Sequence, residues 1–225
     1  MRVSLVCVAT AKYHVFVNPL LDSAERHFLL GHDRIWFVFT DHDFPPRPNT
    51  VFVPVVHRPW PLSTLFRFSD YLTVEKALLA QDYVFAIDAD MLFVGDVGEE
   101  VLGDMVATIH PGYAKKPRAT FPYETRHESV CCVRPTEGSI YFAGGFYGGA
   151  ANLFTHSLHM MERVADHDQL NGIVPKWHCE SVLNRRFIDY PPTLILPWTF
   201  MSPEERRHSE SRLIALRKKH TEMRS

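Results

Sequence analysis

Short runs of apolar residues, each bounded by polar residues or by proline, divide the first half of the chain. Four of these runs are rich in β-branched and aromatic side chains, as buried strands are. They lie at residues 3–9, 35–40, 51–56 and 83–87. No run approaches the roughly 18 consecutive apolar residues that a membrane span requires, so we expect no membrane-spanning segment.

Between the predicted strands, apolar residues recur at helical spacing. Residues 19–30 predict a helix that ends at Gly31, and residues 64–80 carry a second helical pattern. Strands that alternate with helices in this way form a mostly parallel sheet flanked by helices. We therefore predict an α/β fold, and one domain over residues 1–225 because no linker or repeat divides the chain. After about residue 120 the pattern becomes irregular.

Composition and charge exclude several classes of function. The formal net charge is -2, with 46% hydrophobic and 22% charged residues, which is ordinary for a globular domain. Such a chain has no overall basic field for nucleic-acid phosphates, so we expect no nucleic-acid partner. The first apolar run is too short for a signal peptide. The four cysteines of the chain include no C-x-x-C spacing, and this cysteine pattern suits a reducing compartment. We expect a cytoplasmic protein.

Two carboxylates, Asp88 and Asp90, follow directly after the strand predicted at residues 83–87. Ligands of parallel α/β sheets bind beyond the carboxyl ends of the strands, and residues i and i+2 of an extended chain project to the same side. Two like charges there are unfavourable unless a cation joins them, and their hard oxygens suit Mg²⁺ or Mn²⁺ shared with phosphate oxygens. The alternative is that both are solvated loop residues.

Two later segments also carry candidate chemistry. Residues 137–149 place five glycines among four aromatic residues, a pattern typical either of a wall that a ligand approaches closely or of a tight hairpin that faces the core. Glu180 follows Trp177 and His178 and precedes an apolar-periodic stretch. A carboxylate among aromatic residues can act as nucleophile or general base. The alternative is a glutamate favoured by the dipole at a helix N-terminus.

Together these segments resemble glycosyltransferase family 6, which contains the histo-blood-group A and B transferases and the α-1,3-galactosyltransferases. The resemblance runs from Val3 to about Glu204 and rests on a collinear set of motifs. They are Val8 to Tyr13, Ser23 to His32, Asp88-Ala89-Asp90, His110 to Tyr113, Tyr123-Glu124-x-Arg126, Glu137-Gly138, Tyr141 to Gly149 and Trp177-His178-x-Glu180-Ser181-x-Leu183-Asn184. The resemblance implies a GT-A type fold and a metal-dependent, anomer-retaining transfer of a sugar from UDP.

The resemblance also implies roles for individual residues. Glu180 matches the family's essential glutamate, which acts either as the nucleophile of a double displacement or as the base of a same-face reaction. Asp88 and Asp90 would bind Mn²⁺ or Mg²⁺ together with the UDP diphosphate. The other residues expected at the donor are Val8, Ala9, Thr10, Tyr13, Arg67, Ala89, Ala143, Gly144, Gly145, Cys179 and Lys218. The residues expected at the acceptor are His110, Pro122, Trp177, His178 and Glu180.

The small residues from Ala143 to Gly145 bear on the choice of donor. An acetamido group needs more room than a hydroxyl, and in the family a glycine at the position of Gly145 accompanies transfer of N-acetylgalactosamine (GalNAc). We expect UDP-GalNAc to be preferred over UDP-galactose (UDP-Gal). The acceptor implied by the resemblance is a glycan that ends in galactose, with or without fucose, and the new bond is formed at its 3-hydroxyl.

Some positions depart from the family's pattern. Cys179 stands where the family has aspartate, and a thiol is a poor hydrogen-bond acceptor. Ser139 and Ile140 replace an acidic and an aromatic residue, and Pro122 replaces a hydroxylated one. These departures favour an alternative, a catalytically idle UDP-sugar- or carbohydrate-binding protein on the same fold. A nucleotidyltransferase also sets an aspartate at a strand end, but it leaves Glu180 without a role.

A basic run occupies residues 217–220. It is either a solvated tail or, as the resemblance implies, part of a mobile lid over about residues 205–225 that closes on the diphosphate and excludes water. The chain resembles the short bacterial and phage members of the family, which have no anchor. Many bacterial members carry asparagines in place of Asp88 and Asp90. Because both aspartates are present here, we expect strict metal dependence.

Overall fold

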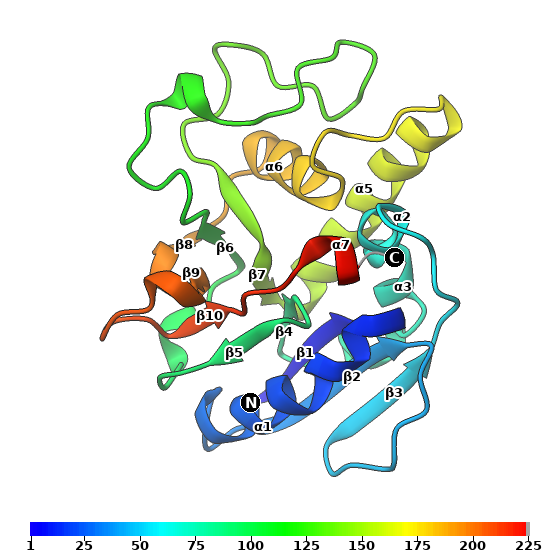
Figure 1. Ribbon diagram of the computed structural model, residues 1–225, viewed down its shortest axis with the longest axis vertical. Coiled ribbons are helices and arrows are strands. Elements are labelled where there is room, and N and C mark those ends of the chain that lie inside the picture. Colours follow the sequence, from blue (N-terminus) through cyan, green and yellow to red (C-terminus); the bar gives the residue numbers. More distant parts are fainter. Residues whose placement is uncertain (224–225) are drawn as a thin grey trace.

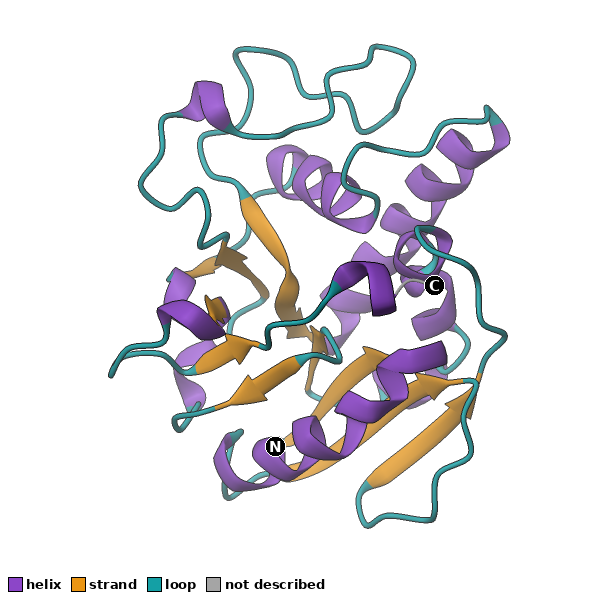
Figure 2. Cartoon of the chain, viewed as in Figure 1, coloured by secondary structure: helices purple, strands orange, loops and turns teal. Residues whose placement is uncertain are grey.

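The computed structural model describes residues 1–223, and its first half follows the predicted alternation of strands and helices (Figures 1 and 2). The four apolar runs form β1 (Arg2–Val8), β2 (Asp33–Thr40), β3 (Thr50–Pro54) and β4 (Tyr83–Ile87), each within two residues of the predicted ends. These strands pair in parallel in the order β3-β2-β1-β4. The four predicted strands are therefore confirmed.

Three later strands complete a seven-stranded sheet with the order β3-β2-β1-β4-β7-β6-β8. They are β6 (Met105–Ile109), β7 (Phe142–Ala150) and β8 (Leu194–Leu196). β7 runs antiparallel to β4 and β6, and β8 runs parallel to β6. The glycine-rich segment is thus one continuous strand that pairs along both edges, so the hairpin interpretation is wrong. The expected mostly parallel sheet of the GT-A type is confirmed.

Helices cover both faces of this sheet because side chains of successive strand residues point to opposite faces. Leu5 of β1 packs into the core beneath α1 (Val17–His27), whereas the next residue, Val6, packs into a second core. That second core includes residues of α5 (Ala151–Leu170) and α6 (Cys179–Asp189). The sheet is therefore buried on both sides, as the apolar runs predict.

The first predicted helix begins and ends earlier than its pattern indicates. α1 follows directly after a 3-10 helix, η1 (Ala11–Phe16), and it ends at His27 instead of residue 30. Beyond it, Leu29 has φ of 46° and Gly31 has φ of 85°. Positive φ values do not continue a right-handed helix, and glycine adopts them without steric cost. The chain then turns directly into β2.

The second helical pattern forms three short helices instead of one. They are α2 (Leu62–Leu65), α3 (Arg67–Leu72) and α4 (Glu75–Leu79). Phe66 and Val74, at the two junctions, have ψ of 13° and 25°, outside the helical region. The Thr73 hydroxyl also donates to the carbonyl of Asp70, a local bond that competes with helix continuation.

A long loop over residues 110–141 joins β6 to β7 and projects at the top of Figure 1, with only a short 3-10 helix, η3 (Arg118–Thr120). The irregular pattern predicted there is confirmed. A second, three-stranded sheet pairs β5 (Met91–Phe93) with β10 (Leu213–Ala215), and β10 with β9 (Ser202–Pro203). The other short elements are η2 (Glu99–Val101), η4 (Trp198–Met201), η5 (Glu204–Arg206) and α7 (His220–Met223). Among the described residues, no helix combines the length and apolarity needed to cross a membrane.

Candidate active site

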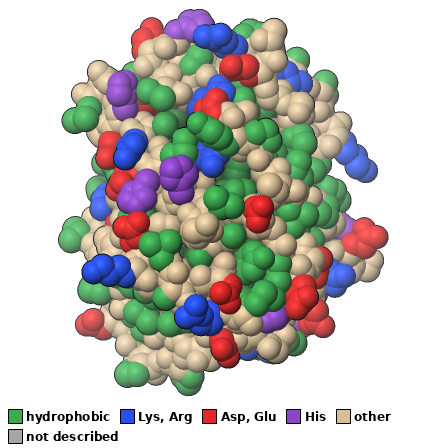
Figure 3. All heavy atoms as spheres, turned by 180° about the vertical axis from the view of Figure 1, so that it is seen from behind, with side chains coloured by type: hydrophobic (Ala, Val, Ile, Leu, Met, Phe, Trp, Pro, Cys, Tyr) green, Lys and Arg blue, Asp and Glu red, His purple; other side chains and the backbone are tan. Residues whose placement is uncertain are grey.

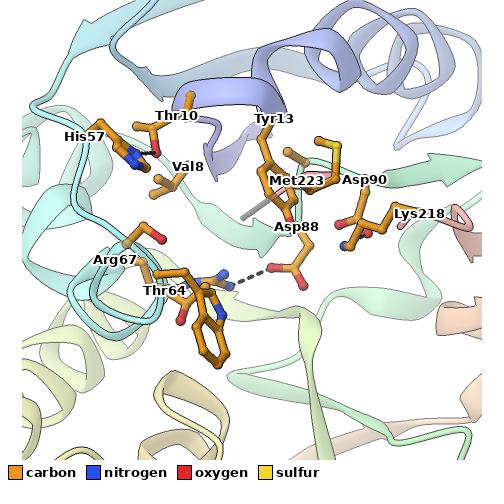
Figure 4. Close-up of a pocket in the computed structure, with 14 residues that line it drawn as sticks. Val8, Thr10, Tyr13, His57, Thr64, Arg67, Asp88, Asp90, Lys218 and Met223 are labelled. Atoms are coloured by element: carbon orange, nitrogen blue, oxygen red, sulfur yellow. Dashed lines mark hydrogen bonds and ion pairs between the residues drawn. The ribbon is translucent and has the colours of Figure 1, made fainter. Parts of the chain in front are cut away.

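A pocket opens where β1 and β4 end at their carboxyl termini (Figure 4). This is the edge of a parallel sheet at which ligands bind. Eight of the predicted donor residues line the pocket: Val8, Thr10, Tyr13, Arg67, Asp88, Ala89, Asp90 and Lys218. Ala9 does not line it, because its side chain is fully buried in the core beneath α1.

Sequence reasoning missed other residues of the pocket lining. They are Ala11, His57, Trp60, Ser63, Thr64 and Met223. His57 lies with Nδ1 3.0 Å from the Thr10 hydroxyl, and the large number of histidines in the chain was a signal that could have pointed to it. Trp60 and Thr64 belong to the segment between β3 and α3, which carries no motif.

A buried ion pair joins Arg67 of α3 to Asp88, which follows β4. Arg67 Nη1 donates to Asp88 Oδ1 at 2.7 Å (dashed in Figure 4), and Arg67 is only 7% exposed. Its Nε atom is buried and has no hydrogen-bond partner in the described part of the chain. Burial raises the pKa of the nearby Cys179 thiol to about 11, so Cys179 stays neutral near pH 7 and gives Arg67 no second anion.

A second ion pair joins Lys218 to Asp90. The Lys218 ammonium contacts Asp90 Oδ2 and lies 5.1 Å from the centre of the Tyr13 ring. Burial raises the pKa of Asp90, and the positive charge of Lys218 opposes that rise. The pairing of β10 with β5 brings the C-terminal segment to this place, and the Leu216 amide donates to the Asp90 carbonyl at 2.8 Å. The basic run is therefore not a solvated tail at Lys218.

The two aspartates also suit a divalent cation. Both line the pocket, and their carboxylate oxygens are the hard ligands that Mg²⁺ and Mn²⁺ prefer. Asp90 is only 5% exposed, so its charge needs a cation close by. Within residues 1–223, no group of three histidine, cysteine, aspartate or glutamate side chains could hold a metal ion alone. A cation bound here would take its remaining ligands from a bound substrate.

Glu180 lies in the first turn of α6, next to β7. Its Oε2 atom accepts the backbone N–H of Gly144 at 3.0 Å. Burial raises the pKa of Glu180 to about 7, although the Gly144 amide and the Tyr141 hydroxyl both favour the charged form. Asn184, one turn further along α6, bonds to both backbone groups of Phe142. These contacts clamp α6 to β7 and fix the place of the carboxylate.

Gly144 connects Glu180 to the ion pair of Arg67 and Asp88. Its N–H donates to Glu180, and its carbonyl accepts a hydrogen bond from Arg67 Nη1 at 3.4 Å. A candidate nucleophile and a candidate cation ligand are thus joined through one residue of β7 and one arginine. Ala143, Gly144, Gly145 and Cys179, which were expected at the donor, do not line the pocket, so the wall interpretation of this strand stays a prediction.

The neighbouring Gly145 lies between Asp88 and the end of the Met201 side chain, outside the lining of the pocket. The Asp88 N–H donates to the Gly145 carbonyl at 3.0 Å. A Cβ atom at Gly145 would lie 2.5 Å from Met201 Cε and 3.5 Å from Asp88 Oδ2. Met201 belongs to η4 and was not singled out from the sequence, which carries no local sign of this contact. Ala143, two residues earlier, is fully buried.

His110, predicted to contact the acceptor, lies outside the pocket lining, at the start of the loop over residues 110–141. Its ring packs against those of Tyr113 and Tyr141. Nδ1 accepts the N–H of Gly112 at 3.0 Å, and burial lowers the pKa of His110 to about 4. His110 is therefore neutral near pH 7 and carries its proton on Nε2.

The other predicted acceptor residues also lie outside the lining of the pocket. The rings of His178 and Trp60 meet edge to face with centroids 4.7 Å apart, and Trp60 lines the pocket. Trp177 is 47% exposed. Pro122 is half-buried in the loop over residues 110–141. His178 thus borders the pocket through Trp60.

The sequence matches the model of glycosyltransferase family 6 over residues 60–225. The chain belongs to this family. Globoside alpha-1,3-N-acetylgalactosaminyltransferase 1 of Canis lupus familiaris is 36% identical to it over 209 residues, and histo-blood group ABO system transferase 1 of Rattus norvegicus is 34% identical over 204 residues. O-antigen biosynthesis glycosyltransferase WbnI of Escherichia coli is 28% identical over 227 residues. The resemblance noted from the motifs is confirmed.

These relatives of family 6 differ in length. The alignments cover 87% and 86% of this chain for the dog and rat proteins and 99% for the bacterial one. They cover 59% of each of the two animal proteins and 97% of the bacterial protein. The chain therefore spans about three-fifths of the length of these animal relatives.

Proposed function

We propose that the chain is a hexosyltransferase that moves GalNAc or galactose from UDP to the 3-hydroxyl of a galactose-terminated glycan, with the α configuration retained. Membership of glycosyltransferase family 6 supports transfer of a sugar, and the name of the dog relative, an alpha-1,3-N-acetylgalactosaminyltransferase, supports this class of donor. The observation that carries the proposal is the series of contacts from Asp88 through Arg67 and Gly144 to Glu180.

The nucleotide would bind at the carboxyl end of β1, where Val8, Thr10 and Tyr13 line the pocket. His57 holds the Thr10 hydroxyl in place, so this hydroxyl is positioned to meet a polar group of uridine. The Tyr13 ring presents a flat face, to which Lys218 is already close. An aromatic face beside a cation suits a base and its diphosphate.

Asp88 and Asp90 would hold Mn²⁺ or Mg²⁺ together with the diphosphate. When bound, the metal supplies Lewis-acid neutralisation of charge on the leaving UDP. Lys218 and Arg67 provide two positive charges at the same place in the chain itself. We propose that the segment over about residues 205–225 acts as a lid through Lys218; residues 224–225 lie outside the described part.

Glu180 would act on the sugar side of the site. Retention requires either two inversions or attack from the face that the UDP leaves, and an ionised carboxylate serves as nucleophile in the first case and as base in the second. The Gly144 N–H orients one carboxylate oxygen without competing for the other. A pKa of about 7 leaves much of Glu180 ionised at neutral pH.

We ascribe a preference for UDP-GalNAc to Gly145 and Met201. Gly145 has no side chain, and the flexible end of Met201 fills the place of its Cβ, so a shift of Met201 alone would make room for an acetamido group, which is larger than a hydroxyl. Ala143 and Gly144 are also small. A methyl group added at Gly145 would take this room, so we expect it to weaken the preference for UDP-GalNAc.

A second candidate function is binding of a UDP-sugar without transfer. The observation that favours it is the unpartnered Nε atom of Arg67 beside the neutral Cys179 thiol. A site that lacks one hydrogen-bond acceptor holds the sugar hydroxyls less firmly, and transfer depends on their position.

The two functions are separated by UDP release from UDP-GalNAc, UDP-Gal, UDP-GlcNAc and UDP-glucose, with and without Mn²⁺ and a Fucα1-2Gal acceptor. The transferase releases UDP slowly with a galacto-configured donor alone and faster when the acceptor is added. Glu180→Gln should lower both rates by about 10³-fold or more while UDP still binds. Binding of UDP with no release from any donor would establish the idle protein instead.

A further inference from the structure

A second pocket, of about 270 Å³, lies outside the site described above. One wall comes from the start of the loop over residues 110–141, and the other comes from η4 and η5. The lining residues are Pro111, Gly112, Ala114, Lys115, Lys116, Trp198 and Arg206. It shares no lining residue with the donor pocket, and only Arg206 falls within the segment proposed as the lid, which acts through Lys218.

The described lining of this pocket is basic and has no acidic member. Lys115, Lys116 and Arg206 are exposed, and none of the three pairs with a carboxylate among residues 1–223. The Lys116 ammonium lies 5.1 Å from the centre of the Tyr113 ring. On the face seen in Figure 3, basic and acidic side chains lie intermixed. Three unneutralised cations around one hollow create a local positive field in a chain whose net charge is -2.

Both walls of the pocket lead to the candidate active site. On one side, Pro111 and Gly112 follow directly after His110, and the Gly112 N–H donates to His110 Nδ1. On the other side, Trp198 and Met201 stand three residues apart in η4. Residues i and i+3 of a 3-10 helix lie on the same side, and Met201 borders Gly145. The pocket therefore lies beside the acceptor side of the site.

We propose that this pocket is an acceptor subsite for an anionic group, a carboxylate or a phosphate, carried by the glycan on a unit other than the galactose that is glycosylated. The inference rests on the proposed function. Lys115, Lys116 and Arg206 supply charge-assisted hydrogen bonds, and the guanidinium fork of Arg206 matches both anions. The indole of Trp198 provides a flat apolar face for an adjoining sugar ring.

Three matched acceptors test the subsite: a neutral galactose-terminated disaccharide, the same disaccharide with a uronic acid as its second unit, and the same disaccharide with a phosphate on that unit. We expect kcat/KM to be about tenfold higher for at least one anionic acceptor, and the gain to shrink as salt rises. A gain for the phosphate alone, or for the uronic acid alone, identifies which anion the subsite takes.

Substitutions in the pocket lining test whether the gain in kcat/KM with anionic acceptors comes from this pocket. Lys115→Ala/Lys116→Ala should remove the gain and leave kcat/KM for the neutral acceptor unchanged. The matched control is Lys76→Ala, an exposed lysine that lines neither pocket, and it should keep the gain. A gain that survives in the double variant, or equal kcat/KM for all three acceptors, would overturn the subsite.

The failure of this inference is distinguishable from failure of the proposed function. UDP release without acceptor reports the donor site alone, and the double variant should not change it. If no acceptor accelerates UDP release, the proposed transfer is wrong. Calorimetric titration with the three glycans then decides the subsite, because an anionic glycan should still bind about tenfold more tightly than the neutral one. Equal binding would overturn the subsite.

Discussion

The ammonium group of Lys218 pairs with the carboxylate of Asp90, which stands 128 residues earlier in the chain. The hydrogen bond from the Leu216 amide to the Asp90 carbonyl and the ladder between β10 and β5 hold the two segments together. The C-terminal segment is therefore part of the donor pocket wall. Anything that binds at Asp90 also acts on the position of this segment.

Lys218→Met should weaken donor binding. The substitution keeps much of the side-chain volume but removes the charge that faces Asp90 and the diphosphate, so we expect KM for the UDP-sugar to rise about tenfold or more. The ratio of hydrolysis to transfer should rise as well, because the lid closes less firmly. Steady-state kinetics with and without acceptor measure both. Lys219→Met is the control, since Lys219 is exposed and pairs with Glu222; equal effects of the two variants would contradict the lid.

The rate should rise with pH through about 7. Burial raises the pKa of Glu180 to about 7, so Glu180 is protonated and inactive below that pH and becomes the ionised nucleophile or base above it. The pH profile of kcat/KM for transfer should show this single ascending limb in the wild type. The residual rate of Glu180→Gln should be lower by about 10³-fold or more and lack the limb. A limb that persists in the variant would assign it to another group.

The ionisation of Glu180 that raises the rate with pH should lower the free energy of unfolding over the same pH range. The folded-state pKa of about 7 lies above the ordinary value of 4.5, so the cost of the buried charge is absent below pH 4.5 and complete above pH 7. Glu180→Gln should therefore be more stable than the wild type at pH 8, by up to about 3 kcal/mol, relative to their difference at pH 4.5. Urea unfolding of both proteins at the two pH values measures this. A difference that does not change with pH would contradict the burial of the charge.

Gly145→Ala should shift the donor preference toward UDP-Gal. The added methyl group would meet Met201 Cε at 2.5 Å and lie 3.5 Å from Asp88 Oδ2, so it takes the space ascribed to the acetamido group. One lost contact of this size changes the ratio of kcat/KM for the two donors by about 10- to 200-fold.

A second substitution tests the role of Met201 in the same space. Met201→Ala in the Gly145→Ala background removes the side chain that the new methyl group meets, and it should restore part of the preference for UDP-GalNAc. Competition between the two donors in one reaction gives the ratio directly. The single variant Met201→Ala is the control for a general loss of activity. An unchanged ratio in Gly145→Ala would place the C2 substituent elsewhere.

Removal of divalent cations should abolish transfer. Asp88 and Asp90 are both present and face the pocket, and without a cation the donor's diphosphate would add negative charge beside two carboxylates. EDTA-treated protein should regain activity when Mn²⁺ or Mg²⁺ is added. Asp90→Asn should raise the metal concentration needed for half-maximal rate. Full activity in EDTA would show that Arg67 and Lys218 suffice and that the metal assignment is wrong.

The strands and eight residues that line the pocket could be predicted, because they depend on short stretches of chain. An apolar run of five residues was enough to locate β4, and Asp88 and Asp90 follow it in the sequence. Met201 and His57 could not be found, because their contacts with Gly145 and Thr10 join segments 56 and 47 residues apart and leave no local pattern. The helical pattern of residues 64–80 was broken by bonds such as that of Thr73, which periodicity does not register.

The antiparallel course of β7 separates two parts of the site, and their sequences can diverge at different rates among related chains. Residues that line the pocket, such as Asp88, stand at the ends of strands whose register fixes them, as the pairing of Ile87 with Phe146 does beside Asp88. The loop over residues 110–141, in contrast, leaves the sheet after β6 and returns at Phe142. Loops of this kind accept insertions and substitutions that strands do not. Related chains can therefore acquire new acceptors by exchange of this loop while the chemistry at the strand ends is inherited unchanged.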